Sequence, residues 1–289
     1  MERLTDPRYI RALCDRFNFR LKKSLGQNFL HDDAVLEAIV EAAVPHGGGA
    51  LEIGPGFGVL TRALSERADK VVAVEIDNQL LPVLDETLKE CDNVSIINGD
   101  VLKLDLAALL TEKFGDMPVS VAANLPYYIT TPILLALLSK NLPFDRIVVM
   151  MQKEVADRIM AKEGGKDYGA LTVAVQYRCA VKRVCRVPAS SFFPPPKVDS
   201  EVLCLSKRET PLVSPKNEDY FFALVRAVFA QRRKTLANGL SNAGRFGSKE
   251  KIAAAIEKMG LSPTVRGETL SIASLSQLSD LLLEENENN

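Results

Sequence analysis

Residues 50–58 read ALEIGPGFG, an apolar run that ends in three glycines at alternate positions. The apolar run is typical of a buried strand, and the glycines let the backbone approach a ligand closely. Residues 59–65, VLTRALS, continue as a helix. A strand, a glycine loop and a helix in this order indicate an open α/β sheet, in which ligands bind beyond the carboxyl ends of the strands.

Strand-like and helix-like patterns alternate from about residue 33 to residue 206, as in a sheet with crossover helices. Helices are expected from a cap at Asp32 or Asp33 to Ala43, and at 59–65, 80–91 and 131–140. Strands are expected at 50–53, 70–76, 94–97, 119–123 and 146–151, with one or two more at 170–187 and an edge or hairpin strand at 198–205.

The character of the sequence changes after Lys207. A polar, proline-containing stretch at 209–217 is followed by helical patterns only, at 218–230, 232–242, 248–259 and 274–285. A chain of 289 residues also exceeds the usual size of a single core. We therefore predict an α/β domain at 1–206 and a smaller all-α domain at 207–289.

The composition, 47% hydrophobic and 25% charged, is that of an ordinary globular protein and excludes a wholly disordered chain. Five scattered cysteines without a CxxC pair indicate neither a disulfide framework nor a metal site. The first residues, charged throughout, lack the apolar core of a signal peptide, and no uncharged stretch of about 18 residues exists for a membrane span. We expect a cytoplasmic, monomeric protein that contacts no membrane and uses no metal.

The net charge of −1 and the pI near 6.2 argue against a protein that is basic all over. They leave room for local basic surfaces. Two segments, 176–188 and 226–245, contain several basic residues and no acidic one. Such runs often form solvent-exposed faces without a binding role. The two segments therefore indicate a binding surface only if they lie near a catalytic site.

Two carboxylates follow the glycine loop at the ends of the next predicted strands. A carboxylate accepts two hydrogen bonds, so Glu75 suits the hydroxyls of a ribose and Asp100 suits the exocyclic amine of an adenine. The loop, with Gly54 and Gly56, has GxGxG spacing and holds no basic residue that could meet a pyrophosphate. S-adenosylmethionine fits this set best, because it has a ribose, an adenine and a positive sulfonium but no phosphate.

The strand expected at 119–123 leads into the tetrapeptide Asn124-Leu125-Pro126-Tyr127. An amide oxygen of Asn124 can accept a proton from the exocyclic amine of a flat base, and Tyr127 can stack on the ring. Pro126 stiffens the turn and helps leave neighbouring carbonyls free as acceptors. A proline turn with an aromatic side chain in the core would give the same tetrapeptide, which alone does not decide between the two readings.

The order of these motifs resembles that of the ribosomal RNA adenine N6-dimethyltransferases. The segment GQNFL at 26–30 is similar to the N-terminal motif of that family, and FFPPPKVDS at 192–200 is similar to its FxPxPKVxS motif. The resemblance implies a Rossmann-like class I methyltransferase domain that uses S-adenosylmethionine. It also implies that Asn28, the Leu30 backbone and Asn124 contact the cofactor, and that Phe192 joins the tetrapeptide at the target base.

The segment FAQRRKTL at 229–236 resembles a marker of the branch that modifies small-subunit rRNA. This resemblance implies dimethylation of N6 on two adjacent adenosines near the 3′ end of that rRNA, within an immature ribosomal subunit. Basic side chains in the two segments are the expected phosphate contacts, with Arg20, Lys22 and Lys23 as further candidates. The principal candidates are Arg178, Lys182, Arg183, Arg232, Arg233 and Lys234.

Three alternatives stay open at this point. A resistance-type enzyme that methylates large-subunit rRNA shares the same core, but such relatives are strongly basic and the pI here is near 6.2. The protein could instead act chiefly as an assembly or checkpoint factor whose methylation is secondary. DNA adenine and protein glutamine methyltransferases more often have DPPY or NPPY, so Leu125 weighs against both.

Overall fold

The computed structural model describes residues 3–20, 22, 27–139 and 142–287. The chain forms two compact units, each described below by itself. The first unit consists of Met1–Ala156 and Ala180–Lys207, and the second of Asp157–Cys179 and Arg208–Asn289.

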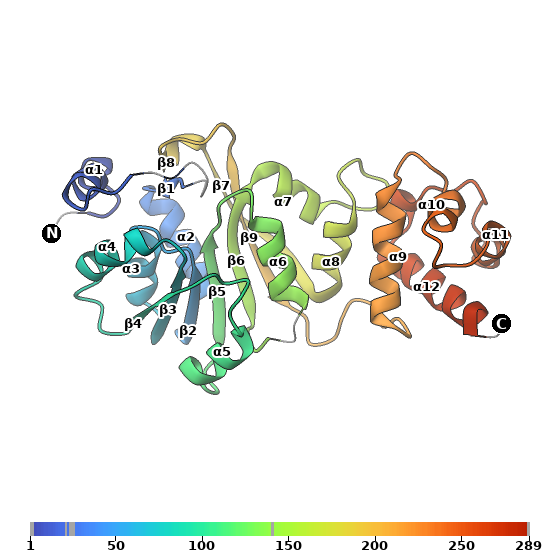
Figure 1. Ribbon diagram of the computed structural model, residues 1–289, viewed down its shortest axis with the longest axis horizontal. Helices are drawn as coiled ribbons and strands as arrows, with labels where there is room; N and C mark the ends of the chain where they lie inside the picture. Colours follow the sequence, from blue (N-terminus) through green and yellow to red (C-terminus); the bar gives the residue numbers. More distant parts are fainter. Residues whose placement is uncertain (1–2, 21, 23–26, 140–141, 288–289) are drawn as a thin grey trace. The chain divides into compact units, whose positions relative to one another are not determined.

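A mixed sheet of seven strands forms the centre of the first unit (Figure 1). The strand order is β4-β3-β2-β5-β6-β9-β7. Strands β2 to β6 pair in parallel, and β9 pairs antiparallel to β6. The strands are β2 (Gly49–Ile53), β3 (Lys70–Glu75), β4 (Val94–Asn98), β5 (Val119–Asn124), β6 (Arg146–Gln152), β7 (Cys179–Val187) and β9 (Ser200–Lys207).

Continuous apolar runs explain why the central strands form where they do. Every residue of β2 is buried, as are the five residues of β3 after Lys70, which is typical of parallel strands covered on both faces. The helices of this unit are α1 (Pro7–Arg16), α2 (Asp33–Ala43), α3 (Val59–Ser65), α4 (Leu81–Thr87), α5 (Leu106–Phe114) and α6 (Thr130–Ser139), while α7 (Lys153–Met160) begins in this unit and ends in the second. The predicted α/β class is confirmed.

A second, two-stranded sheet joins segments that are far apart in the sequence. Strand β1 (Phe29–Leu30) pairs antiparallel with β8 (Phe192–Phe193), so that Leu30 lies opposite Phe192. Asp32 supports the same junction, because one carboxylate oxygen caps α2 at Ala34 and Val35 while the other accepts a hydrogen bond from the Ser191 hydroxyl at 2.8 Å. The N-terminal motif and the FxPxPKVxS-like motif are therefore neighbours.

The second unit is helical and has its own core. Its helices are α8 (Ala170–Arg178), α9 (Glu218–Ala230), α10 (Leu236–Asn242), α11 (Lys249–Lys258) and α12 (Ile272–Glu287). Tyr177 of α8 contacts Phe221 and Phe222 of α9 with ring centroids 5.6 and 5.1 Å apart. Residues 157–179 cluster with this unit although the sequence assigned them to 1–206, so the domain assignment of 1–206 and 207–289 stays a prediction.

The expectation of one or two strands at 170–187 was wrong in its first half. Residues 170–178 form the helix α8, which buries Thr172, Val173 and Val175. These β-branched residues favour strands, but packing against the second core decides the outcome. Strand β9 is also an interior strand and not an edge, because β7 follows it in the sheet.

Three further observations bear on the sequence expectations. Within the described residues, no helix is both long and apolar enough to cross a membrane. The same part of the chain holds no cluster of three histidine, cysteine, aspartate or glutamate side chains suited to a metal ion. All five cysteines are free thiols, and burial raises the pKa of Cys14 and of Cys185.

Candidate active site

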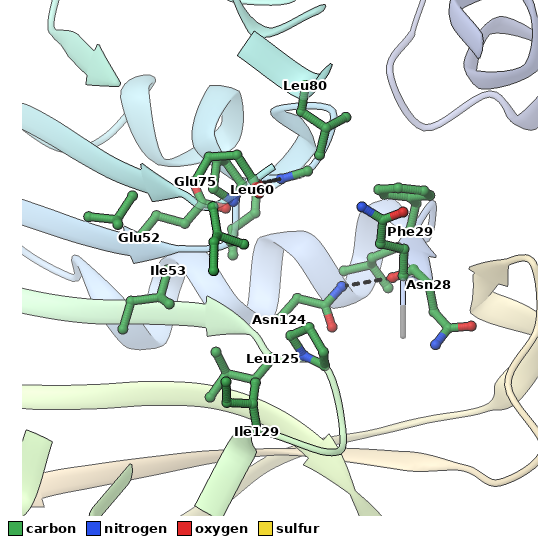
Figure 2. Close-up of a pocket in the computed structure, with 18 of the residues that line it drawn as sticks. Asn28, Phe29, Glu52, Ile53, Leu60, Glu75, Leu80, Asn124, Leu125 and Ile129 are labelled. Carbon is green, nitrogen blue, oxygen red and sulfur yellow. Dashed lines mark hydrogen bonds between the residues drawn. The ribbon is translucent and has the colours of Figure 1, made fainter. Parts of the chain in front are cut away.

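One pocket lies at the carboxyl ends of the parallel strands β2, β3 and β5 and is closed on another side by β1 and β8. Figure 2 shows Glu75, Asn28 and Asn124 around this space. The structure brings together here every residue expected to hold the cofactor or the target base. These lining residues are Asn28, Leu30, Gly54, Gly56, Glu75, Asp100, Asn124, Leu125, Pro126, Tyr127 and Phe192; their individual roles stay predictions.

The glycine loop requires glycine for two different reasons. Gly54 has φ +72°, a left-handed conformation that other residues rarely adopt. Gly56 has φ +60°, and a Cβ atom there would lie 2.9 Å from the Phe29 ring. The backbone of the loop therefore lies closer to the N-terminal motif than a side chain would allow.

Glu75, at the end of β3, is buried and already bound on both oxygens. Its Oε1 accepts a hydrogen bond from the Asp77 N–H at 2.8 Å, and its Oε2 accepts one from the Gly56 N–H at 3.3 Å. The pKa of Glu75 is raised, because the effect of burial is larger than the opposing effect of these backbone hydrogen bonds. Each carboxylate oxygen has a second lone pair, so the side chain keeps two acceptor positions for a diol.

Asp100 is half-buried and stabilises the turn that it begins. Its Oδ1 accepts a hydrogen bond from the Leu102 N–H at 3.0 Å, and its Oδ2 lies 3.6 Å from the Lys103 ammonium. The side chain still lines the pocket, so these contacts fix its position without removing it from the site.

The structure fixes the orientation of the Asn124 amide. Its Nδ2 donates a hydrogen bond to the backbone carbonyl of Asn28 at 3.2 Å, drawn as a dashed line in Figure 2. Because the nitrogen is assigned to this bond, the side-chain oxygen is directed away from it. An acceptor oxygen at the end of β5 is the arrangement that the sequence analysis expected for gripping an amine.

The aromatic residues of the site differ in their contacts and in their exposure to solvent. The Tyr127 hydroxyl lies 2.8 Å from the Ser200 hydroxyl on β9, and Phe192 is buried in β8. Tyr128 also lines the pocket and is 58% exposed. Tyr128 was not among the expected site residues, although its aromatic side chain directly follows the tetrapeptide in the sequence.

Glu52, on β2, is a second residue that the sequence analysis left without a role. It lines the pocket, its residue is 1% exposed, and its Oε2 is among the buried atoms that have no hydrogen-bond partner. Burial raises the pKa of Glu52 to about 8, and the nearby Glu75 charge adds to the shift while Thr61 opposes it. Burial thus favours the uncharged form of this side chain.

We expect Glu52→Gln to remove a pH dependence of stability. The folded protein holds this proton up to a pH of about 8, whereas an unfolded chain releases it near 4.5, so the unfolding free energy of the wild type falls as pH rises between these values. Thermal denaturation across this range should show the variant gaining on the wild type, by about 5 kcal/mol in total, because the folded and unfolded pKa values differ by about 3.5 units. The exposed Glu41→Gln serves as the control; parallel curves for Glu52→Gln and wild type would contradict the assignment.

The candidate phosphate contacts of the second unit lie on its surface. Arg232, Arg233 and Lys234 are exposed in the turn between α9 and α10. The Arg232 guanidinium is 3.3 Å from the Glu268 carboxylate. Arg178 is bound to Glu218 and lies over the rings of Tyr177 and Phe222 at 5.0 and 5.2 Å.

The basic segment on β7 is opposed by an acid from another strand. Glu201 of β9 is buried and lies 2.8 Å from Arg183 and 3.7 Å from Arg186, while Lys182 is exposed. A segment with no acidic residue in its own sequence is therefore partly neutralised in space. Of the N-terminal candidates, Arg20 is exposed, Lys22 is bound to Asp77, and Lys23, like Gly26, lies outside the described residues.

The residues of the pocket fit S-adenosylmethionine. The close approach of the Gly56 backbone to Phe29 leaves no room for a side chain, and Glu75 keeps two acceptor positions for ribose hydroxyls. The unpartnered Glu52 oxygen adds a polar atom to the same wall. The loop from Gly54 to Gly58 has no lysine or arginine that would suit a phosphate.

Known proteins resemble this chain over almost its whole length. Residues 18–283 match the family described as ribosomal RNA adenine dimethylase. The protein named ribosomal RNA small subunit methyltransferase A from Geobacillus thermodenitrificans is 51% identical over 284 residues, 97% of each chain. Its namesake from Bacillus cytotoxicus is 50% identical over 287 residues, 98% of each chain.

Two solved structures share the fold. A dimethyladenosine transferase from Plasmodium falciparum matches with a TM-score of 0.72 and 29% identity, covering 90% of this chain and 98% of that one. The 23S rRNA methyltransferase ErmE matches with a TM-score of 0.65 and 26% identity, covering 88% and 99%. The fold and the site thus define a class I methyltransferase that uses S-adenosylmethionine. The chain belongs to the ribosomal RNA adenine dimethylase family.

Proposed function

We propose that this protein dimethylates N6 of two adjacent adenosines near the 3′ end of small-subunit rRNA while the subunit is still immature. The observation that supports this most strongly is that the expected cofactor and target-base residues line a single pocket. Relatives about half identical over nearly the full chain have names that specify the small subunit. We further propose that the protein acts in the cytoplasm as a monomer, where its substrate is assembled.

Asn124 is the residue that we assign to the target amine. Adenine N6 is a poor nucleophile because its lone pair is delocalised into the ring. An amide oxygen of Asn124 and a backbone carbonyl of Leu125-Pro126 would accept the two protons of that amine and localise the lone pair on nitrogen. The bond from Asn124 to the Asn28 carbonyl supports this role, because it orients the amide before the base arrives.

Tyr127 and Phe192 are assigned to the faces of the target base. A base held between two rings must be flipped out or single-stranded, which suits RNA in an immature particle. The Ser200 hydroxyl would keep Tyr127 in place, and the β1–β8 pairing would keep Phe192 in place. No general base is needed before transfer, since the amine loses its proton readily once the nitrogen is positive.

Bound S-adenosylmethionine supplies an activated methyl group on a positively charged sulfur. Glu75 would hold its ribose, Asp100 its adenine amine, and the backbone of the Gly54–Gly58 loop would lie against it. Asn28 and the Leu30 backbone complete the proposed set on the opposite wall. All of these residues except Gly58 line the pocket.

A large-subunit rRNA methyltransferase is the second candidate, and the likeness to ErmE favours it. Its identity of 26% is about half that of the small-subunit relatives.

In a direct test, purified protein and methyl-labelled S-adenosylmethionine are incubated with immature small subunits and, separately, with immature large subunits. We expect label only in small-subunit rRNA, released as N6,N6-dimethyladenosine; label in large-subunit rRNA would favour the alternative, and binding without label would favour an assembly factor.

Replacing Arg232, Arg233 and Lys234 together by alanine should weaken binding to immature small subunits. The salt dependence of binding should flatten by up to about three phosphate contacts, while cofactor affinity stays unchanged. Because Arg232 also pairs with Glu268, thermal denaturation must accompany the titration.

The matched control replaces three lysines of α11 in the same unit, Lys249, Lys251 and Lys258, by alanine. It removes the same charge from another surface and should change binding less. A stable Arg232, Arg233 and Lys234 variant with the affinity and salt slope of the wild type would exclude this turn from the RNA contact. Lys182 and its neighbours on β7 would then become the leading candidates.

A further inference from the structure

Asp77 is a buried carboxylate two residues beyond Glu75, and its side chain is 1% exposed. Three donors from two parts of the chain surround it. The Lys22 ammonium lies 2.7 Å from Oδ1, the Gln79 N–H donates to the same oxygen at 3.1 Å, and the Gln27 amide donates to Oδ2 at 3.3 Å. The Lys22 N–H in turn donates to Oε1 of Gln27 at 3.1 Å, which joins the two N-terminal donors to each other.

Of the two N-terminal donors, Gln27 belongs to the N-terminal motif and Lys22 precedes it, and this motif forms part of the pocket lining. Gln27, Asn28, Phe29 and Leu30 all line it. The Asn28 carbonyl accepts the hydrogen bond of Asn124, and Phe29 packs on Phe57 of the glycine loop with ring centroids 4.3 Å apart. The position of this short segment therefore affects both the cofactor wall and the catalytic amide.

Asp77 also acts on the other side of the pocket. Its N–H donates to Glu75 Oε1 at 2.8 Å, so its backbone orients the proposed ribose acceptor. Its side chain, through Lys22 and Gln27, holds the segment that faces that acceptor. A single residue thus links the two walls between which the cofactor would lie.

We propose that Asp77, Lys22 and Gln27 form a clasp in which Asp77 is a positioning residue for the N-terminal motif and thereby slows release of S-adenosylmethionine. This inference rests on the proposed function of the pocket and adds a role for residues that the family motifs leave unassigned. It also moves Lys22 from the candidate RNA contacts to the cofactor site.

A purely local role for Asp77 would need only one of its contacts. The bond to the Gln79 N–H caps the short helix at Asn78–Leu80, as an aspartate does at many helix starts. The cap does not require Lys22 or Gln27, which are remote in sequence. A buried carboxylate left without its cation is strongly disfavoured, so the charge of Lys22 is the part of the clasp to remove in a test.

The test measures the dissociation rate and dissociation constant of S-adenosylmethionine in four variants of the full chain. Lys22→Met removes the ammonium and keeps the length of the side chain. Asp77→Asn removes the carboxylate charge and keeps an oxygen that can cap the helix at Asn78–Leu80. The third variant combines these two substitutions, and the fourth, Lys22→Arg, keeps a cation at position 22. We expect dissociation to speed up about threefold in Lys22→Met and about tenfold in Asp77→Asn, with Lys22→Arg close to wild type. Because the two residues act as one unit, the combined variant should equal Asp77→Asn and not multiply the two losses.

The control is Lys113→Met, which removes the ammonium of an ion pair to Glu112 on α5, away from the pocket. Thermal denaturation of every variant separates a loss of folding from a faster release of the cofactor. Lys22 is half-exposed, so Lys22→Met still tests the clasp if Asp77→Asn does not fold. Dissociation in Lys22→Met equal to that in Lys113→Met would overturn the clasp while leaving the proposed function intact. A wild-type protein that binds no S-adenosylmethionine would overturn both.

Discussion

Asn124→Ala should reduce methyl transfer by at least about a hundredfold while changing the affinity for S-adenosylmethionine little. The reason is that the side-chain oxygen is assigned to the target amine, whereas the ribose and adenine of the cofactor are assigned to Glu75 and Asp100. The contact to the cofactor that the family resemblance implies for Asn124 is therefore only one of several. A single-turnover assay on immature small subunits measures the transfer, and calorimetry measures the cofactor affinity. The assignment of Asn124 to the target amine requires that the loss of methyl transfer be much larger than the loss of cofactor affinity.

The structure adds a complication that the control must address. Alanine at position 124 also removes the donor to the Asn28 carbonyl, so part of the loss could come from a displaced N-terminal motif. Asn93→Ala is the matched control, because the Asn93 amide also donates to backbone carbonyls, those of Ser65 and Ala68, but lies outside the pocket. Equal losses of transfer and of cofactor affinity in Asn124→Ala would refute the assignment of Asn124 to the amine.

Glu75→Ala should show the reverse pattern. Loss of a charged acceptor costs about 1.5–3 kcal/mol, which is a decrease in cofactor affinity of roughly 10- to 150-fold. Transfer at saturating cofactor should recover substantially, because the target-base residues remain. Calorimetry and the dependence of the rate on cofactor concentration provide the two measurements.

Glu75→Gln is the informative companion variant. It keeps the size of the side chain and one acceptor oxygen, but its amide nitrogen would oppose either the Gly56 N–H or the Asp77 N–H. We therefore expect an intermediate affinity. Unchanged affinity in Glu75→Ala would mean that this carboxylate serves only to hold the two backbone groups.

Sequence patterns predict the parallel part of the sheet well, because each central strand is buried on both faces and reads as a short apolar run. The glycine loop was equally readable, since Gly54 adopts a conformation that glycine favours. Residues 170–178 were misread because a helix buried in a second core can contain as many β-branched residues as a strand. The local sequence of residues 170–178 does not show that they pack into the core of the second unit.

Contacts between remote residues are the part of the site that the sequence did not predict. The acid that opposes Arg183 is Glu201, on another strand, and the acid that binds Lys22 is Asp77. The orientation of the Asn124 amide depends on a carbonyl 96 positions away. The high pKa of Glu52 arises from burial beside a second carboxylate, which becomes visible only when β2 and β3 are paired.

The most direct test of the central claim examines rRNA in cells. Primer extension through the 3′ region of small-subunit rRNA stops at N6,N6-dimethyladenosine, so it reports both the position and the presence of the modification. We predict two adjacent stops in the parent strain, none in a strain that lacks the gene, and their return with the wild-type chain but not with Asn124→Ala. Persistence of both stops in the deletion strain, or their return with Asn124→Ala, would contradict the account.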